Sequence, residues 1–576
     1  MSPAPWVSQY DAGVPATLAP YPDGSILDRI ADTARQRPNH PALVFKGQTV
    51  TYGQLERLSD AFAAALAAEG IRPGDRVALV LPNCPQAFIA ELGAWKAGAI
   101  AAPLNPLYSE HELAHALEDC GAAAVVVMTP FYKKIKKIQA RTALRRVIVT
   151  NIKEGLPPHL RVLFTLFKEK KEGHRVDVAP GDLRMKELLA RYAGSPRPPV
   201  TLSPSDPALL LFTGGTTGVP KGAVGTHGGL LKTAVQLHAW FRPIMTDWQD
   251  VMLQVMPLFH VYGNAGVSMV AFYGHNTLAL VPNPRDLDDV VATIKRVRPA
   301  FVPGVPTLFI ALLNHPDVQA GRVDFKSIKL CISGAAPLLA ETRERFEALT
   351  GGRMLEGYGL TESMMAAIIS PINGKTPPGA VGLPLPDVEV RIADPAGAPL
   401  PAREVGEILM KAPQLMTKYW NGERETQTVL RDGWLRTGDL GYMDEDGFVF
   451  IVDRTKDVIK PGGFQVWPRE VEEAIAMHPA VAEVSVAGVP DPYQGEAVKA
   501  WVVLAKDATA TADEIRTFCR ERLAAYKIPR HVEFRESLPK STVGKVLRRM
   551  LREEAQAPPP AAAPPPAPQP EGTATR

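Results

Sequence analysis

The chain has 576 residues, 46% of them hydrophobic and 22% charged, with a formal net charge of +3. This length predicts two or more domains with a large core, and the balanced charge argues against a nucleic-acid-binding protein. Four widely spaced cysteines argue against a disulfide framework or a zinc site, and with an N-terminus that lacks signal-peptide features they predict a cytoplasmic protein.

Short β-branched runs alternate with longer helical patterns over the first 450 residues. Arg76–Leu81 is a predicted buried strand, Pro85–Gly98 a helix and Ile100–Leu104 a second strand. Further strands are predicted at Ala123–Val127, Arg146–Thr150, Leu209–Thr213, Val251–Pro257, Ala300–Pro303 and Lys329–Ser333. This alternation predicts an α/β domain with layered, largely parallel sheets.

The pattern changes near residue 450. Tyr442–Asp453 predicts a β-hairpin with Asp446 and Gly447 in its turn. Beyond it, the sequence predicts a small α+β domain with a strand and two helices. These elements are expected at Val484–Val489, Pro468–Met477 and Ala512–Ala525.

We place the domain boundary in the polar stretch that follows the hairpin. A large domain then covers residues 1–453 and a small domain covers residues 454–554. Residues 555–576 are nearly all proline and alanine. They are predicted to be disordered, because so little apolar bulk cannot offset the entropy of ordering the chain.

A loop rich in glycine and threonine follows the strand predicted at Leu209–Thr213. Its glycines let successive backbone N–H groups turn toward a polyanion, its threonines add hydroxyl donors, and its lysine adds charge. This favours a triphosphate-binding loop over an ordinary surface loop, although the lysine follows Gly-Val-Pro and the pattern is not Walker A. The residues assigned to phosphate binding are Thr213, Gly214, Gly215, Thr216, Thr217, Gly218 and Lys221.

With six later motifs, this loop makes the chain resemble the adenylate-forming enzymes, a family that includes acyl-CoA synthetases, peptide-synthetase adenylation domains and luciferases. The other motifs are Pro257–His260, Ser333–Leu338, Gly357–Glu362, Gly433–Asp439, Asp453–Asp457 and Leu538–Lys545. They keep the family's order and spacing over residues 25–552, so a chance match to the whole set is negligible. The resemblance implies a large N-terminal α/β domain and a small, mobile C-terminal α+β domain. It also implies an activity in which ATP activates a carboxylic acid as acyl-AMP and the acyl group passes to coenzyme A (CoA).

The resemblance further implies where the nucleotide binds. Adenine would stack on Tyr358, and Asp439 with Arg454 would bind the ribose hydroxyls. Taken alone, Tyr358 could be a core tyrosine, and the other two could be halves of a surface ion pair. The residues assigned to the nucleotide are Gly334, Ala335, Ala336, Pro337, Gly357, Tyr358, Gly359, Asp439 and Arg454.

Four catalytic residues follow from the same resemblance. Thr361 would contact the phosphate, and Glu362 would hold Mg²⁺, a hard cation that prefers oxygen ligands. Lys545 would be the mobile lysine that bridges the α-phosphate and the acyl carboxylate, although composition alone would make it a solvated cation. His260 would line the channel for the acyl group and the thiol, and a buried histidine with a core partner is the alternative.

For transfer to CoA, the resemblance implies that the small domain swings about a hinge at Lys456. That swing would replace Lys545 at the site with residues 460–465. Gly462 departs from the family pattern, because some relatives carry a lysine there, so no side-chain contact to CoA is expected from it. The residues assigned to the hinge or to CoA are Lys456, Lys460, Gly463, Phe464 and Gln465.

Two features bear on the identity of the acid. Bacterial long-chain fatty acid–CoA ligases resemble the chain at Gly215 and through Val219–Ala223. In addition, residues 131–175 carry thirteen Lys or Arg and only three acidic residues. Within this segment, Leu160, Leu163, Phe164 and Phe167 recur at helical spacing and predict an amphipathic basic helix.

A helix of this kind has two interpretations. It could rest on the cytoplasmic face of an anionic membrane, which would suit an acid that partitions into lipid. Alternatively, its apolar stripe packs on the domain and its lysines are solvated. No stretch reaches the roughly 20 consecutive apolar residues of a membrane-spanning helix.

The leading interpretation is an ATP-dependent long-chain fatty acid–CoA ligase. Alternatives within the same chemistry are a ligase for medium-chain or aryl acids, or one that loads a carrier protein. A luciferase is a remote option. An inactive nucleotide- or lipid-binding adaptor belongs to a different class, and the intact set Lys221, Glu362, Asp439, Arg454 and Lys545 argues against it.

Overall fold

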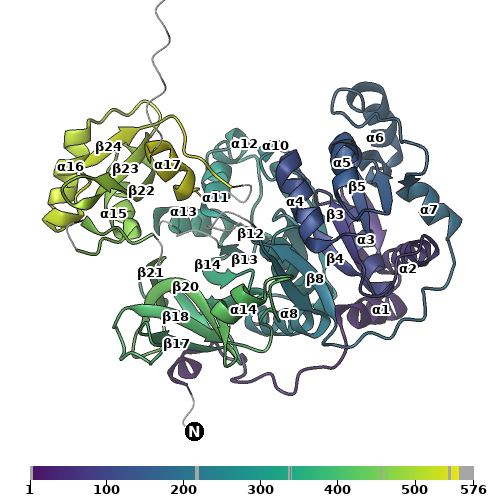
Figure 1. Ribbon diagram of the computed structural model, residues 1–576, viewed down its shortest axis with the longest axis horizontal. Coiled ribbons are helices and arrows are strands. Elements are labelled where there is room, and N and C mark those ends of the chain that lie inside the picture. The colour runs from purple at the N-terminus through teal and green to yellow at the C-terminus, as the bar shows by residue number, and fades with distance from the viewer. Residues whose placement is uncertain are drawn as a thin grey trace, which may run out of the picture. The chain divides into compact units, whose positions relative to one another are not determined.

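The computed structural model describes residues 4–213, 220–334, 338, 340–454, 457–461, 464–541 and 546–556. They divide into two compact units, which we call the large unit (residues 4–454) and the small unit (residues 457–556); Figure 1 labels their elements. The prediction places the boundary after residue 453, but Arg454 ends a strand of the large unit, where it pairs with Asp439. The predicted tail, residues 555–576, lies outside the described residues except for Ala555 and Gln556, which end a helix.

A seven-stranded sheet forms one half of the large unit. Its order is β7 (Leu183–Arg184), β6 (Arg146–Thr150), β5 (Ala124–Met128), β3 (Arg76–Val80), β4 (Ile100–Pro103), β8 (Pro207–Phe212) and β9 (Gly222–Thr226). All neighbours are parallel except β8 and β9, which form a hairpin. Val77 and Leu79 lie in the main core, whereas Ala78 and Val80 lie in a second core on the other face. Both faces are therefore buried, as expected of parallel strands.

A fourteen-stranded sheet forms the other half. Its order is β17 (Glu389–Ala393), β18 (Gly406–Lys411), β20 (Trp434–Met443), β21 (Val449–Arg454), β16 (Ala380–Pro384), β15 (Met365–Ile369), β14 (Arg353–Leu360), β13 (Leu330–Ser333), β12 (Phe301–Gly304), β10 (Val251–Gln254), β11 (Thr277–Leu280), β1 (Pro41–Phe45) and β2 (Gln48–Thr51), with β19 (Leu430–Arg431) beside β20. The strands from β14 to β1 are parallel, and pairing beyond β14 is antiparallel. The sheet thus changes direction at β14, the strand that ends in the predicted nucleotide motif.

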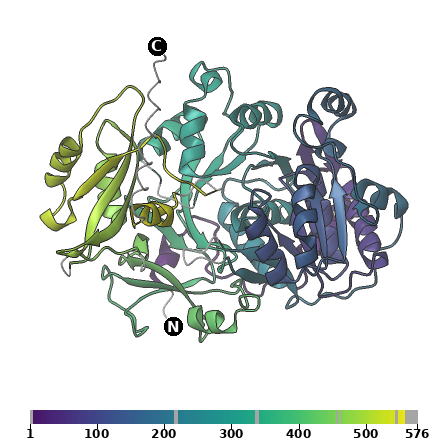
Figure 2. The ribbon, with the colours of Figure 1, turned by 45° about the horizontal axis from the view of Figure 1, so that its top comes forward.

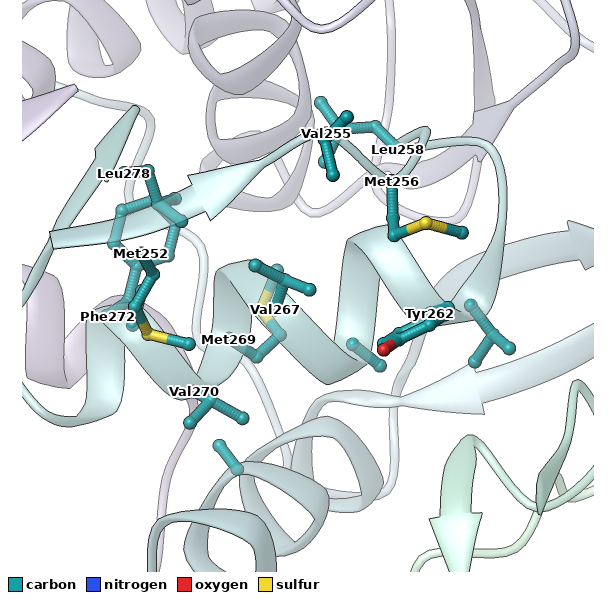
Figure 3. Packing of buried hydrophobic residues seen from close by; sticks show 14 of the residues in the cluster. Met252, Val255, Met256, Leu258, Tyr262, Val267, Met269, Val270, Phe272 and Leu278 are labelled. Carbon is teal, nitrogen blue, oxygen red and sulfur yellow. The ribbon is translucent and has the colours of Figure 1, made fainter. Parts of the chain in front are cut away.

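Helices cover both sheets of the large unit (Figure 2). They are α1 (Ile26–Gln36), α2 (Tyr52–Ala68), α3 (Pro85–Lys96), α4 (Glu110–Cys120), α5 (Tyr132–Ile138), α6 (Pro158–Leu163), α7 (Met185–Arg191), α8 (His227–Phe241), α9 (Val270–Tyr273), α10 (Leu287–Val297), α11 (Pro306–Leu313), α12 (Pro316–Gln319), α13 (Ala340–Thr350) and α14 (Glu423–Val429), with π-helices η5 (Phe164–Lys168) and η6 (Tyr262–Met269). Figure 3 shows how η6 packs in the main core, where Val267 and Met269 lie on the same helix as Tyr262 and near β10. The π-helix η6 is therefore part of the main core.

The small unit is an α+β fold. Strands β22 (Val481–Asp491), β23 (Gly495–Leu504) and β24 (His531–Phe534) form its sheet, with helices α15 (Pro468–Ala476), α16 (Ala512–Arg520) and α17 (Arg548–Gln556). The helix predicted over Ala512–Ala525 ends early, because the N–H groups of Arg522 and Leu523 both bond to the Cys519 carbonyl. The other predicted strands and helices are present in the two units, and the predicted hairpin is present in the large unit as β20 and β21.

All four cysteines are buried and free. None of the helices that the structure describes is long and apolar enough to cross a bilayer.

Candidate active site

The predicted phosphate loop lies at the tip of the β8–β9 hairpin. Phe212 pairs with Gly222, and the Thr213 N–H donates to the Lys221 carbonyl at 2.9 Å, so the two ends of the loop are held together. The loop residues Gly214, Gly215, Thr216, Thr217 and Gly218 lie outside the described residues.

The side chain of Lys221 lies close to a tyrosine and a glutamate. Its Nζ is 3.8 Å from Glu425 Oε1 and 5.6 Å from the centre of the Tyr419 ring. The Tyr419 hydroxyl donates to Glu362 Oε1 at 2.6 Å. The structure therefore brings Lys221 and Glu362, which are far apart in the sequence, to the same tyrosine.

Tyr419 belongs to no motif that the sequence analysis identified. Burial and the adjacent Glu362 carboxylate raise its pKa, so the phenol stays protonated and acts as the donor. The Met416 N–H also donates to the Glu362 carbonyl, at 2.9 Å. Backbone and side chain of Glu362 are thus both fixed by residues 416–419, which lie between β18 and α14.

Asp439, Arg454 and Tyr358 form a second cluster. Asp439 and Arg454 are cross-strand partners on β20 and β21, with 3.2 Å between Arg454 Nε and Asp439 Oδ1. The Tyr358 hydroxyl donates to Asp439 Oδ2 at 2.6 Å. Burial and Asp439 raise the pKa of Tyr358 well above its usual range, so it remains a donor. The three predicted nucleotide residues therefore lie together.

Close packing requires a glycine at position 359 of the nucleotide motif, and Gly266 of η6 also lies close to Met365. A Cβ at Gly359 would lie 2.1 Å from the carbonyl oxygen of Met365, and a Cβ at Gly266 would lie 2.6 Å from the sulfur of the same residue. Met365 itself has a φ of 120°, a strained conformation for a residue with a side chain. Strain of this kind is concentrated at functional sites. Here the strained residue Met365 lies next to Gly359 and Gly266.

His260 lies at the start of the turn that leads into η6. Its Nδ1 accepts the N–H of Tyr262 at 3.2 Å, so the neutral ring carries its proton on Nε2. The Tyr262 hydroxyl donates in turn to the carbonyl of Ile332 at 2.8 Å, which links η6 to β13. Thr361 begins the turn after β14, where its carbonyl accepts the N–H of Met364 at 3.1 Å.

A largely apolar cavity connects His260 with the nucleotide motifs. Its lining includes Leu237 and Phe241 of α8 and Ile369 of β15. The predicted site residues His260, Gly334, Gly357 and Gly359 line the same cavity. The adjoining residues Ala335, Ala336 and Pro337 are outside the described ranges. The arrangement can hold an apolar group next to the nucleotide motifs.

Three of the residues assigned to the hinge or to CoA are described in the small unit. The Lys460 N–H donates to Glu496 Oε2 at 2.8 Å, and Gln465 is exposed. The exposed ring of Phe464 stacks on Tyr526 with 4.7 Å between ring centres. Lys456, Gly463 and the predicted catalytic Lys545 lie outside the described residues.

The profile of the AMP-binding enzyme family matches residues 30–420, and that of the AMP-binding enzyme C-terminal domain matches residues 470–545. The chain is 40% identical over 557 residues to the long-chain-fatty-acid–CoA ligase of Bacillus subtilis, covering 96% of this chain and 98% of the relative.

Solved structures show the same fold. The anthranilate CoA ligase AuaEII in complex with anthranoyl-AMP is 26% identical with a TM-score of 0.81, covering 92% of this chain and 97% of that one. ATP-bound MatB from Rhodopseudomonas palustris is 32% identical with a TM-score of 0.78, covering 92% and 99%. The predicted α/β architecture and the adenylate-forming resemblance are both confirmed, and the chain belongs to the family of AMP-binding enzymes.

Proposed function

We propose that the protein is an ATP-dependent long-chain fatty acid–CoA ligase. The carboxylate of the acid attacks the α-phosphorus of ATP and releases pyrophosphate, and the CoA thiol then displaces AMP from the acyl-AMP. The observation that carries the proposal is the apolar cavity between His260 and the nucleotide motifs. The chain that contains it is similar along nearly its whole length to a long-chain-fatty-acid–CoA ligase.

In the first step, the nucleotide would be held by the two clusters of the large unit. Asp439 is 5% exposed and already oriented by Tyr358 and Arg454, and its remaining lone pairs would accept the ribose hydroxyls. Adenine would lie against Tyr358 and the backbone of residues 334–337. The phosphates would take N–H groups of the loop between Thr213 and Lys221, together with the Lys221 charge.

The reaction mainly requires that the carboxylate and the α-phosphate be positioned together and that their negative charges be neutralised. The substrate carboxylate is itself the nucleophile, so no covalent intermediate with the enzyme is needed. Lys545 would lie between the carboxylate and the α-phosphate and stabilise the charge that grows in the transition state. Thr361 would donate to the same phosphate.

The residues present fit a divalent cation at Glu362. Only Oε1 accepts the Tyr419 hydroxyl, and the side chain is only partly buried, so carboxylate lone pairs remain for a hard ion. Mg²⁺ bound there together with ATP would supply positive charge to the phosphates. Among the described residues no cluster of three His, Cys, Asp or Glu forms a complete protein cage, which agrees with an ion held jointly by the enzyme and its nucleotide.

For the second step, the small unit would swing about Lys456 and bring Lys460, Gly463, Phe464 and Gln465 to the CoA. Their backbone and the exposed Phe464 ring offer a path for pantetheine. His260 would line the channel along which the thiol reaches the acyl carbonyl. The buried thiols of the chain agree with a cytoplasmic enzyme, and the basic segment 131–175 with contact at the cytoplasmic membrane face.

The test is direct turnover with ATP, Mg²⁺, CoA and a panel of acids, following AMP and acyl-CoA by mass spectrometry. We expect palmitate and oleate to give acyl-CoA much faster than octanoate, benzoate or coumarate. Preference for octanoate or an aryl acid would replace the long-chain assignment. Acyl-AMP that accumulates without thioester would point to a carrier protein as acceptor, and no acid-dependent AMP at all would favour the inactive adaptor.

A further inference from the structure

An exposed apolar surface lies between β6 and β7, away from the residues of the proposed reaction. Val162, Leu163, Leu166 and Phe167 are 59, 49, 69 and 72% exposed. We call these four residues the apolar tip. They are four of the twelve large hydrophobic side chains that are exposed among the described residues, and they fall within six consecutive positions. Such clustering marks an interaction surface, whereas single exposed hydrophobic residues need no explanation.

The local helix geometry creates the apolar tip. The sequence predicts Leu160, Leu163, Phe164 and Phe167 on one helical face, but Leu160 and Phe164 pack inward and the other two point outward. Beyond Phe164 the helix continues as a π-helical turn, in which the Glu169 N–H donates to the Phe164 carbonyl at 2.8 Å. The extra residue in this turn shifts the helical register. Figure 1 shows α6, which leads into this turn, at the outer margin of the large unit.

Buried contacts beneath the apolar tip hold it in place. The Phe164 ring packs edge-on against His174, with 5.3 Å between ring centres, and His174 Nδ1 bonds to Thr129 Oγ1 at 2.7 Å. Glu169 is buried and accepts from Asn151 Nδ2 at 2.9 Å and from Lys153 Nζ at 2.7 Å. The apolar tip is thus the outer side of an anchored element.

Positive charge surrounds the apolar tip. Lys170, Lys171 and Arg175 are exposed, and no carboxylate of the described residues lies within 4 Å of their charged groups. Of the two nearby acids, Glu169 is neutralised by Lys153, and Glu172 lies 3.6 Å from Lys168. A free phosphate or an acidic peptide would satisfy these cations but leave the four apolar side chains in water. An anionic bilayer satisfies both, because headgroup phosphates lie above an apolar layer.

We propose that the apolar tip docks the protein on the surface of an anionic lipid bilayer. Val162, Leu163, Leu166 and Phe167 enter the boundary of the acyl chains, and Lys170, Lys171 and Arg175 contact lipid phosphates. The docking is independent of the ligase reaction, although it would place the enzyme where a long-chain acid is concentrated.

Vesicle co-sedimentation of the full chain, without substrates, tests the proposal. Wild-type protein is expected to bind phosphatidylcholine vesicles containing phosphatidylglycerol and to bind pure phosphatidylcholine weakly. The double variant L166S/F167S should lose about 100-fold in partition, roughly tenfold for each apolar side chain. The variant K170Q/K171Q should lose about fivefold for each charge. The matched control L107S/V405S removes two exposed apolar side chains elsewhere in the large unit and should bind as wild type.

A labelling experiment covers the case in which a variant folds poorly. Because the four native cysteines are buried, an environment-sensitive fluorophore on Leu166→Cys is site-specific. Its emission should shift to the blue with anionic vesicles, whereas a label on Leu107→Cys should not respond. Wild type without preference for anionic vesicles, or L166S/F167S that binds as tightly as wild type, would refute the proposal. So would a dimer that L166S/F167S dissociates, since a second copy would then cover the apolar tip. Each of these results leaves the ligase assignment untouched.

Discussion

At the scale of single residues, the candidate site relies on two tyrosine–carboxylate pairs. Tyr358 donates to Asp439, and Tyr419 donates to Glu362. Burial and the neighbouring carboxylate raise the pKa of both phenols, so neither loses its proton near neutral pH. A tyrosine that can only donate fixes one carboxylate oxygen and leaves lone pairs of the carboxylate for a ligand.

We predict that Tyr419→Phe weakens the response to Mg²⁺. The variant removes the donor from Glu362 Oε1, and a hydrogen bond to a charged group contributes about 1.5–3 kcal/mol. Acid-dependent exchange of pyrophosphate into ATP, followed against Mg²⁺ concentration, should require about tenfold more Mg²⁺ for half-maximal rate. Tyr442→Phe, whose ring stacks on Phe450, is the control and should leave the curve unchanged. An unaltered Mg²⁺ requirement in Tyr419→Phe would remove Tyr419 from the site.

Sequence reasoning could identify the residues of contiguous motifs but not those brought in by folding. Asp439 and Arg454 are predicted as a pair and are cross-strand neighbours, because a tight hairpin joins their strands. Tyr419 escapes prediction because it lies 57 positions from Glu362 and in no motif. Its contribution depends on the bridge between Tyr419 and Ala223, a contact between distant segments.

At the scale of elements, helix α3 and the π-helix η6 are joined by a buried acid. Glu91 is 1% exposed, and Asn264 Nδ2 donates to its Oε1 at 2.7 Å. Burial raises the pKa of Glu91 to about 7, from an ordinary value of 4.5. The folded state therefore binds the proton more tightly than the unfolded state. The stabilisation that this proton provides is complete below pH 4.5 and is lost as the pH rises through 7.

We predict that Glu91→Gln removes this pH dependence. The amide keeps an acceptor for Asn264 and avoids the cost of a buried charge. The gain in stability over wild type should be small at pH 5 and reach on the order of 1–3 kcal/mol at pH 8. Thermal unfolding at the two pH values measures it, with the exposed Glu344→Gln as control. An equal difference at both pH values would show that Glu91 does not titrate as described.

Helix α8 supplies the next prediction, through Phe241. Its buried side chain lines the cavity beside His260 and also a second cavity that Met252 and Val270 line. Phe241→Ala should join the two and raise kcat/KM for palmitate relative to decanoate by about tenfold. The control is Phe309→Ala, which truncates a buried ring that packs on Phe346. It should lower the free energy of unfolding by about as much as Phe241→Ala does, about 3–5 kcal/mol. If both variants keep the chain-length preference of wild type, Phe241 does not limit the acyl site.

Elements with a strong period were predictable, and those with an irregular turn were not. β3, β6 and β13 carry continuous apolar runs, which parallel strands buried on both faces require. The periodicity predicts Leu160, Leu163, Phe164 and Phe167 on one helical face, whereas Leu160 and Phe164 pack inward and Leu163 and Phe167 are exposed. A regular period also does not include the extra residue of the π-turn that follows. The π-turn arises from packing beneath it, through Phe164 and Glu169, which periodicity does not encode.

At the scale of the whole molecule, the division into two units matches a reaction in two halves. The large unit contains the clusters around Asp439 and Glu362 and the apolar cavity. The small unit contains the segments around Lys460 and on both sides of residues 542–545. In the second, Lys540 pairs with Val546, and Arg548 bonds to Glu472, so the described residues on both sides of residues 542–545 are anchored in the small unit. In the proposed reaction, rotation of the small unit would replace the segment that carries Lys545 with the segment around Lys460 at the nucleotide.

This exchange predicts that two lysines separate the half-reactions. Lys545→Ala should slow acyl-AMP formation by about 10²–10³-fold, the effect of losing one preplaced charge, yet still convert supplied palmitoyl-AMP and CoA to thioester. Lys456→Pro, which restricts the backbone at the proposed hinge, should form acyl-AMP but transfer it slowly. Lys506→Ala, at an exposed site of the small unit, should change neither step. Rapid-quench measurement of each half-reaction distinguishes the three variants. If Lys545→Ala and Lys456→Pro slow both steps equally, a single fixed arrangement of the two units serves the whole reaction.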